Sequence, residues 1–233
     1  MYIGGINKTT LLDYPEHIAT TIFLTGCNFR CPFCHNRSLI IEKEYPPSLS
    51  SDEILSFLKK RHSLLEGVCI TGGEPTIQKD LPNFIKAIKQ LHLKVKLDTN
   101  GSNPNMLQYL LEQNLLDYVA MDVKNSLEKY PLTIGYSKPN PFSTKTIETS
   151  VSLLQNSSIS YEFRTTIVKE LHTNEDMHNI GKWLNNSPLL FLQSFQNSEE
   201  VLVNGFSSHT KETLLEFQSI LSTYIKQVNI RGI

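Results

Sequence analysis

The sequence predicts an α/β protein in which a parallel β-sheet has helices outside it. Short runs rich in apolar and β-branched residues alternate about six times with longer runs that have helical apolar spacing. No linker, low-complexity segment or break in composition interrupts the alternation, so residues 1–233 are expected to form a single domain. Periodicity alone does not decide whether the sheet closes into a barrel or stays open and doubly wound. In either architecture the chemistry belongs at the carboxyl ends of the strands.

The expected strands follow an extended lead-in at residues 1–17, which contains a turn at 13–16. The first strand is expected at 17–24, because the run His-Ile-Ala-Thr-Thr-Ile-Phe-Leu is rich in β-branched and aromatic residues. The further strands are expected at 68–71, 95–98, 118–123, 161–168, 189–193 and 228–231.

The expected helices are marked by caps and by apolar spacing. Ser50 and Glu53 form a capping-box pattern for a helix that runs to about Lys60. Asn103 and Pro104 suit the cap and the first position of a helix at 104–113. The other helices are expected at 81–90, at 144–155, from a cap at 173–176 to Trp183, and at 208–223.

The overall charge is nearly balanced, with 22 basic and 23 acidic residues and a net charge of −1. This balance argues against a nucleic-acid or membrane surface and favours a protein or a small molecule as partner. The start of the chain lacks the basic and apolar pattern of a signal peptide, and no apolar run reaches the ~20 residues of a membrane span. We therefore expect a cytoplasmic protein.

Three of the four cysteines, Cys27, Cys31 and Cys34, lie in one short loop after the first strand. Gly26 and Pro32 allow this loop to bend and to bring the three thiols together. A disulfide framework is not expected, because the number is odd and no secretory signal is seen. The spacing therefore predicts a metal site.

Two kinds of metal site are consistent with three thiols. A structural zinc site needs a fourth ligand, for which the nearby candidate is His35, although a residue adjacent to Cys34 is poorly placed. A 4Fe–4S cluster is normally held by four thiolates, so three thiolates leave one iron without a protein ligand. The lone Cys69 lies in an apolar strand and suits a small buried side chain.

The spacing C-x3-C-x2-C, with the aromatic Phe33 just before the third cysteine, resembles the signature of the radical SAM superfamily. The resemblance implies a partial (β/α)6 TIM-like barrel of about this length. It also implies a 4Fe–4S cluster on Cys27, Cys31 and Cys34, with S-adenosylmethionine bound at the open iron. Phe33, His35 and Asn36 would then lie near the cofactor.

The segment Thr71-Gly72-Gly73-Glu74-Pro75 ends the second expected strand. Two glycines let the backbone approach a ligand and leave its N–H and C=O groups free, although a simple turn would give the same pattern. In radical SAM enzymes the matching segment holds the amino group of the methionyl moiety, which implicates Gly72, Gly73, Glu74 and Pro75.

Charged residues end the next two strands, in Asp98-Thr99-Asn100-Gly101 and Asp122-Val123-Lys124. Such charges at one barrel mouth are costly unless they pair with each other or with a charged ligand, and a structural Asp–Lys pair remains an alternative. Both segments resemble those of glycyl-radical activating enzymes. The resemblance implies that Lys124 contacts the cofactor carboxylate and that Asp98, Thr99, Asp122 and Val123 form polar surroundings with a position for a monovalent cation.

Arg164 is a charge inside the apolar run of the fifth strand, so it should neutralise Glu162 or the bound cofactor or substrate. We favour the cofactor or substrate. Gln193, at the end of the sixth strand, and Arg231 are weaker candidates for the site. The remaining histidines are expected on the solvated surface: His62, His92, His172, His178 and His209.

Within the superfamily the chain is most similar to the activating proteins of anaerobic ribonucleoside-triphosphate reductase, close to the pyruvate formate-lyase activating type. Leu12-Asp13-Tyr14-Pro15, Cys34-His35-Asn36 and Phe163-Arg164-Thr165-Thr166 carry this likeness, and Glu16 departs from it where a glycine is common. The resemblance implies reductive cleavage of S-adenosylmethionine and removal of a hydrogen from a glycine of a glycyl-radical enzyme. It also implies a flavodoxin or ferredoxin-type reductant.

Two other functions remain open from the sequence. One is a radical SAM enzyme that acts on a small molecule, such as a pterin-like nucleoside precursor, with the same core. The other is a non-catalytic metal or electron-transfer protein, which would need His35 or Cys69 as a further ligand.

Overall fold

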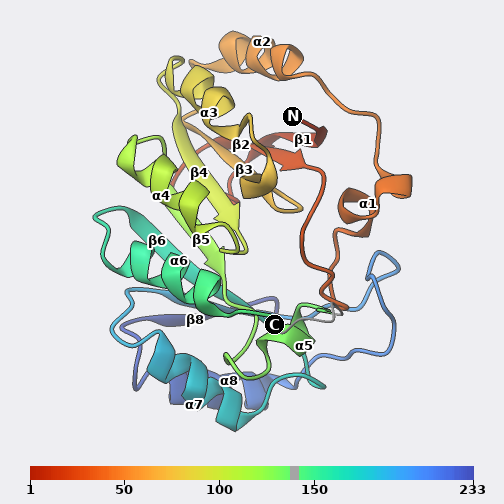
Figure 1. The fold of residues 1–233 in the computed structure, drawn as a ribbon, viewed down its shortest axis with the longest axis vertical. Helices are drawn as coiled ribbons and strands as arrows, with labels where there is room; N and C mark the ends of the chain where they lie inside the picture. Colours follow the sequence, from red (N-terminus) through yellow and green to blue (C-terminus); the bar gives the residue numbers. More distant parts are fainter. Residues whose placement is uncertain (137–141) are drawn as a thin grey trace.

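The computed structural model describes residues 1–136 and 142–233, and its eight strands form one sheet in the order β1 to β8 (Figure 1). β1 is antiparallel to β2, and β2 to β8 are parallel throughout. The strands are β1 Ile3–Thr10, β2 Ala19–Leu24, β3 Gly67–Gly72, β4 Lys94–Thr99, β5 Tyr118–Asp122, β6 Ser160–Ile167, β7 Leu190–Ser194 and β8 Val228–Arg231.

The predicted parallel sheet with outer helices is confirmed, and its connections form six β/α units followed by β8. The helices are α1 Arg37–Ile40, α2 Ser51–Arg61, α3 Leu81–Lys89, α4 Pro104–Glu112, α5 Tyr130–Thr133, α6 Lys145–Gln155, α7 Asn174–Trp183 and α8 Lys211–Leu221. Among the described residues β1 and β8 are the two edges of the sheet, so the curved sheet stays open between them.

The expected lead-in at residues 1–17 contains a strand, β1, of eight residues. β1 pairs with β2 from Ile3 opposite Leu24 to Thr10 opposite Ala19, with two irregularities in register. Its glycines and its exposed polar residues give a weak strand pattern, so pairing with β2 decides its structure.

Most helix starts follow the predicted caps. The capping box of Ser50 with Glu53 is formed, and the Asn103 side chain accepts a hydrogen bond from the backbone of Met106. The last helix begins at Lys211 rather than 208, because the Thr210 hydroxyl accepts from the backbone of Thr213 and caps it there. The helices α1 and α5 have four residues each, too short for a periodic signal.

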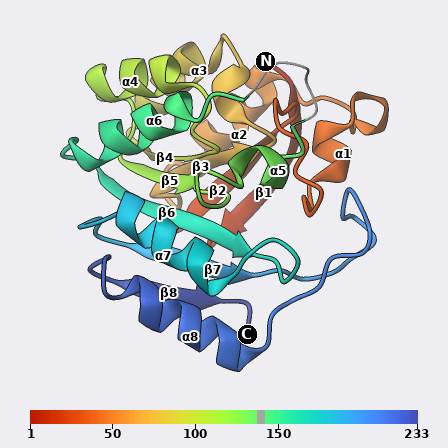
Figure 2. The ribbon, with the colours of Figure 1, turned by 60° about the horizontal axis from the view of Figure 1, so that its bottom comes forward.

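The main core lies between the sheet and the helices that follow its convex side, α2 to α4 and α6 to α8 (Figures 1 and 2). Strand residues such as Val95, Val119 and Phe163 are fully buried, as are Ile85 of α3 and Leu110 of α4. No helix within the described ranges is long and apolar enough to span a membrane.

The carboxyl ends of β2 and β3 approach each other very closely. The Gly73 N–H donates to the Leu24 carbonyl at 2.8 Å, and the Glu74 N–H donates to the Gly26 carbonyl at 2.8 Å. A Cβ added at Gly73 would lie 2.0 Å from the Gly26 oxygen, and one at Gly72, whose φ is +118°, would lie 2.3 Å from the Leu24 oxygen. Both glycines are therefore required for the cysteine loop to start where it does.

We expect Gly73→Ala to lower the free energy of unfolding by about 2 kcal/mol or more, because backbone must move to admit the methyl group. Gly5→Ala is a matched control, since its Cβ would only meet the Phe23 ring at 4.0 Å. Urea unfolding of both variants measures the difference. Equal stabilities of the two variants would contradict the close approach.

Candidate functional site

A cavity of about 280 Å³ opens at the carboxyl ends of the parallel strands. It gathers residues that are far apart in the sequence, from the cysteine loop and from the ends of β3 to β7. Its walls are Cys27, Phe29, Cys31, Phe33, Cys34, His35, Asn36, Ile40, Thr71, Gly72, Gly73, Asp98, Thr99, Asn100, Asp122, Lys124, Arg164, Thr166 and Gln193. Four residues that the sequence suggested for the site, Glu74, Pro75, Val123 and Arg231, lie outside this lining.

The cysteine loop connects β2 to α1 and is held by two distant segments. On one side the Arg30 N–H donates to the Ile134 carbonyl at 3.0 Å. On the other side the Leu202 N–H donates to the Cys34 carbonyl at 3.0 Å, and the Val203 N–H donates to the Pro32 carbonyl at 2.9 Å. The loop is therefore fixed by the protein around it.

N–H groups point at two of the loop sulfurs. The Phe29 N–H donates to Cys27 Sγ and the Asn36 N–H donates to Cys34 Sγ, both at 3.4 Å. Burial raises the pKa of the Cys27 thiol to about 11 and that of Cys31 to about 12. Thiolates at these positions therefore need a positive partner, and N–H groups aimed at sulfur also tune iron–sulfur ligands.

The donor set fits a 4Fe–4S cluster better than a single metal ion. Three thiols lie on one wall of one cavity. In the described part of the chain no three His, Cys, Asp or Glu side chains lie close enough together to hold one ion. A cluster does not require such a set, because each thiolate ligates a different iron.

His35 and Cys69 do not complete the set of three cysteines. The His35 ring stacks on Phe195, and its Nε2 contacts the Gln196 carbonyl. Cys69 is fully buried in β3, where its sulfur lies 3.8 Å from Lys96 Nζ. The structure therefore does not favour the electron carrier that needs one of them as a ligand.

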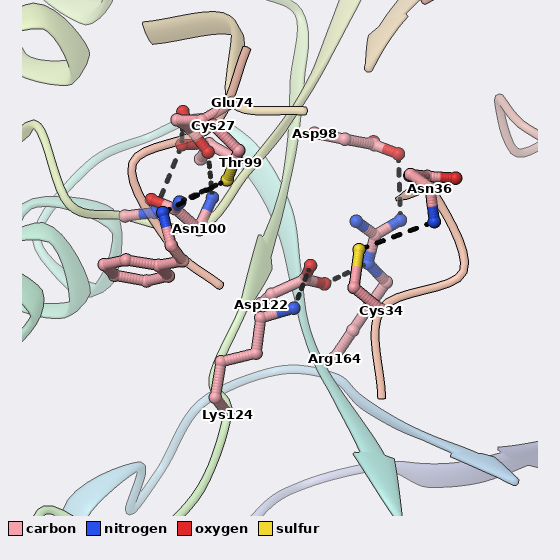
Figure 3. A network of polar contacts seen from close by, with 12 residues as sticks. Cys27, Cys34, Asn36, Glu74, Asp98, Thr99, Asn100, Asp122, Lys124 and Arg164 are labelled. Atoms are coloured by element: carbon pink, nitrogen blue, oxygen red, sulfur yellow. Dashed lines mark hydrogen bonds and ion pairs between the residues drawn. The ribbon is translucent and has the colours of Figure 1, made fainter. Parts of the chain in front are cut away.

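Glu74 is buried behind the cavity wall, where it joins the ends of β3 and β4 (Figure 3). Its carboxylate accepts from the Thr99 hydroxyl at 2.7 Å and from the Asn100 N–H at 2.6 Å. The Asn100 side-chain amide in turn faces Cys27 Sγ at 3.9 Å. Pro75 is also buried and begins a 3-10 turn, Pro75–Ile77. Both residues support the wall from behind.

Opposite the cysteines a chain of alternating charges crosses three strands (Figure 3). Lys96 Nζ pairs with Asp98, and Asp98 Oδ2 lies 2.9 Å from Arg164 Nη1. Arg164 Nε lies 3.0 Å from Asp122 Oδ1, and Asp122 Oδ2 lies 2.8 Å from Lys124 Nζ. We call these five residues the ion chain.

Ion pairing outweighs burial for Asp122 and Lys124, and each favours the charged form of the other. Burial alone would raise the pKa of Asp122, but the charges of Arg164 and Lys124 outweigh it and lower this pKa to about 2. For Lys124 burial acts in the lowering direction, and the charge of Asp122 raises its pKa above the usual value. Four members of the ion chain line the cavity, namely Asp98, Asp122, Lys124 and Arg164, and Lys96 lies outside the lining.

Arg164 pairs with Asp98 and Asp122 rather than with Glu162, because strand register places it beside Asp122. It also lines the cavity, and its contact with a cofactor or substrate stays a prediction. Glu162 accepts instead from the Tyr118 hydroxyl at 2.8 Å and pairs with Arg231 Nη1 at 3.5 Å, so Arg231 lies at this pair and not at the cavity. The Arg164 guanidinium occupies the space between the two aspartates. A monovalent cation there stays a prediction, and it would require this guanidinium to move.

Sequence reasoning missed Lys96, Asn100 and Thr166 at or beside the site. Lys96 and Asp98 alternate on one face of β4, and that pattern of charges in a buried strand could have signalled Lys96. Asn100 and Thr166 lie within motifs that the sequence did single out, Asp98-Thr99-Asn100-Gly101 and Phe163-Arg164-Thr165-Thr166.

The five histidines that were expected on the surface differ in their exposure to solvent. His62, His92 and His178 are exposed and His209 is half-buried. His172 is wrongly expected on the surface: it is 1% exposed, because the loop after β6 turns its ring inward against the Lys124 carbonyl.

The loop that follows β5 is anchored to the start of α7. The Ser126 hydroxyl donates to Asp176 Oδ1 at 3.0 Å, and Lys129 Nζ lies 2.7 Å from Asp176 Oδ2. Asp176 also accepts from the backbone N–H of Thr173 and caps α7. Burial opposes ionisation of Asp176, but Lys129 and the other donors lower its pKa below the usual value.

We expect Asp176→Asn to cost about 1–3 kcal/mol of stability at pH 7, because an amide cannot accept from all these donors. The folded pKa of Asp176 is lowered. The stabilisation is therefore complete above the unfolded pKa of about 4 and is lost as the pH falls through the folded value. Urea unfolding from pH 7 to pH 3 should show the gap between wild type and variant narrowing below about pH 4, and a gap independent of pH would contradict this.

A family model and similar proteins indicate the same family for this chain. The model of the radical SAM superfamily matches residues 21–178. A protein of Methanocaldococcus jannaschii, named as a candidate glycyl-radical enzyme activating enzyme, is 30% identical over 234 residues, which cover 99% of this chain and 96% of that protein. A second protein of that organism with the same kind of name is 26% identical over 79% of this chain and 66% of its own length.

Solved structures share the fold. A radical SAM methyltransferase from Sphaerobacter thermophilus has a TM-score of 0.70 at 14% identity, over 94% of this chain and 68% of that chain. SuiB of Streptococcus suis, bound to S-adenosylmethionine, has a TM-score of 0.66 at 13% identity over 91% of this chain, which spans about half of SuiB (51%). From the family match and the cysteine-lined cavity, the chain belongs to the radical SAM superfamily, whose members use a 4Fe–4S cluster and S-adenosylmethionine.

Proposed function

We propose that this protein is a glycyl-radical enzyme activating enzyme whose partner is an anaerobic ribonucleotide reductase. The observation that carries the proposal is the match to a relative of that kind over 99% of this chain and 96% of the relative. The cavity supports it, because three thiols face a wall of fixed charges across a space that a small cofactor can enter.

Each wall of the cavity has a proposed part in binding. Cys27, Cys31 and Cys34 hold three irons of the cluster and leave the fourth open. Lys124, the end of the ion chain, offers its positive charge to the carboxylate of S-adenosylmethionine. The Gly72 and Gly73 backbone receives the methionyl amino group.

Further lining residues complete the proposed contacts. Phe33 lies beside the adenine. His35, Asn36 and Gln193 line the cofactor space, and Asn36 Nδ2 donates to the Gly72 carbonyl at 2.9 Å, which joins the cysteine loop to the glycine segment. Glu74 and Pro75 act from behind this wall, and Asp98 and Asp122 act through the ion chain.

When bound, the cluster supplies one electron, received from a flavodoxin or ferredoxin-type reductant, that cleaves S-adenosylmethionine into methionine and a 5′-deoxyadenosyl radical. That radical would take one hydrogen atom from the Cα of a glycine in the partner. The C–H bond of the glycine would break, a C–H bond would form in 5′-deoxyadenosine, and the unpaired electron would stay on the glycine. The protein positions the reactants and excludes water.

A second candidate is a radical SAM enzyme that acts on a nucleotide. It is favoured by a match to an S-adenosylmethionine-dependent nucleotide dehydratase of Lacinutrix mariniflava, 35% identical over 114 residues. That match covers 47% of this chain and 24% of the dehydratase, so it supports a shared core more than a shared substrate.

We also propose that residues 1–233 work as one radical SAM core domain in the cytoplasm. All four cysteines are free thiols, and a reducing compartment keeps thiols in that state.

The test begins with anaerobic reconstitution, reduction with dithionite and addition of S-adenosylmethionine. We expect 5′-deoxyadenosine to form, and a glycyl radical to appear in the electron paramagnetic resonance spectrum when an anaerobic ribonucleotide reductase is added. Cys31→Ala should abolish both products. Cys69→Ala is the matched control and should retain them, because Cys69 lies outside the cavity lining.

Two outcomes would contradict the proposal. Cleavage without a glycyl radical, but with turnover of a nucleotide, would favour the second candidate. A reduced cluster that leaves S-adenosylmethionine intact would remove the activating function altogether.

A further inference from the structure

His172 is a buried histidine outside the cavity that contacts the backbone of a cavity residue. It lies in the loop between β6 and α7, is 1% exposed, and is absent from the cavity lining. Its ring Nε2 lies 2.9 Å from the Lys124 carbonyl oxygen. Its Nδ1 lies 3.1 Å from the backbone nitrogen of Val168.

These two contacts fix the tautomer of His172. A carbonyl only accepts, so Nε2 must carry the proton and donate it to Lys124. In the neutral ring Nδ1 is then the acceptor for the Val168 N–H. Nδ1 also lies 3.2 Å from the Val168 carbonyl oxygen, which accepts the backbone N–H of His172 at 3.0 Å. Burial lowers the pKa of His172, which agrees with a neutral ring.

His172 contacts the Lys124 carbonyl just after β5 ends, where the chain leaves the sheet. The Val123 N–H donates to the Arg164 carbonyl at 2.8 Å, just beyond the last residue of β5. Beyond it, Asn125 Nδ2 donates to the Leu171 carbonyl at 3.0 Å. Between these two fixed points the peptide of Lys124 is held by His172.

The direction of the Lys124 side chain depends on this peptide. Its ammonium must reach Asp122 on one side and the cavity on the other, and both are set by the backbone at residue 124. A peptide that rotates would turn the end of the ion chain away from the cavity.

We propose that His172 is a positioning residue that fixes the Lys124 backbone, and thereby aims the Lys124 ammonium at the carboxylate of S-adenosylmethionine. This inference rests on the role proposed above for Lys124. His172 itself touches neither the cofactor nor the cluster ligands.

Two variants separate the two hydrogen bonds of the ring. The amide of His172→Gln reaches the position of Nε2 and can donate to the Lys124 carbonyl. The amide oxygen of His172→Asn reaches the position of Nδ1 and can accept from Val168, but leaves the Lys124 carbonyl unpaired. A purely structural role in the loop after β6 would favour Asn over Gln.

The dissociation constant of S-adenosylmethionine is measured on the anaerobic, cluster-loaded protein, and KM and kcat for 5′-deoxyadenosine formation are measured separately. We expect His172→Asn to raise the dissociation constant and KM about tenfold, the loss of one hydrogen bond to a positioned group, with kcat at saturation near wild type. His172→Gln should stay within about threefold. His178→Asn, at an exposed site on α7, is the control and should bind as wild type.

Lys124→Met distinguishes the failure of this inference from that of the proposed function. If Lys124→Met weakens binding and His172→Asn does not, the His172 inference alone is overturned. If Lys124→Met binds as tightly as wild type, the proposed role of Lys124 falls and the inference with it. Equal losses in His172→Asn and His172→Gln that follow their melting temperatures would make His172 structural only.

Discussion

The site depends on the ion chain, in which three cations alternate with two carboxylates, and all of its members except Lys96 line the cavity. Largely buried charges are tolerated only in ion pairs of good geometry. Each carboxylate of the ion chain has two cationic partners. Lys124 ends the ion chain at the cavity, where Asp122 is its carboxylate partner. In the proposed function the carboxylate of S-adenosylmethionine would be a second partner for this ammonium.

The fold supplies this arrangement through the parallel sheet. The ends of β2 to β7 meet at one edge, so the cysteine loop, the paired glycines and the ion chain share one cavity. The supports lie behind the wall: Glu74 joins β3 to β4, and the segment from Val168 to Asp176 holds the loop after β5. These groups lie outside the cavity lining and hold the backbone that carries lining residues such as Asn100 and Lys124.

The parallel sheet and the cysteine loop could be predicted from the sequence, because strand composition and cysteine spacing are local signals. β1 could not, since its pairing with β2 overrides a weak pattern. The ion-pair partners of Arg164 could not be predicted from the sequence either. They depend on the register between β5 and β6, which places Arg164 beside Asp122. The burial of His172 could not be predicted, because the residues next to it in the sequence do not indicate that the loop after β6 turns its ring into the protein.

The most direct test of the proposed role of Lys124 compares S-adenosylmethionine with its decarboxylated form, by measuring both dissociation constants on the anaerobic, cluster-loaded protein. The ion chain predicts that wild type binds the decarboxylated form at least about tenfold more weakly, and that this ratio narrows in Lys124→Met. A ratio that is the same in wild type and in Lys124→Met, or equal binding of both compounds by wild type, would contradict the account.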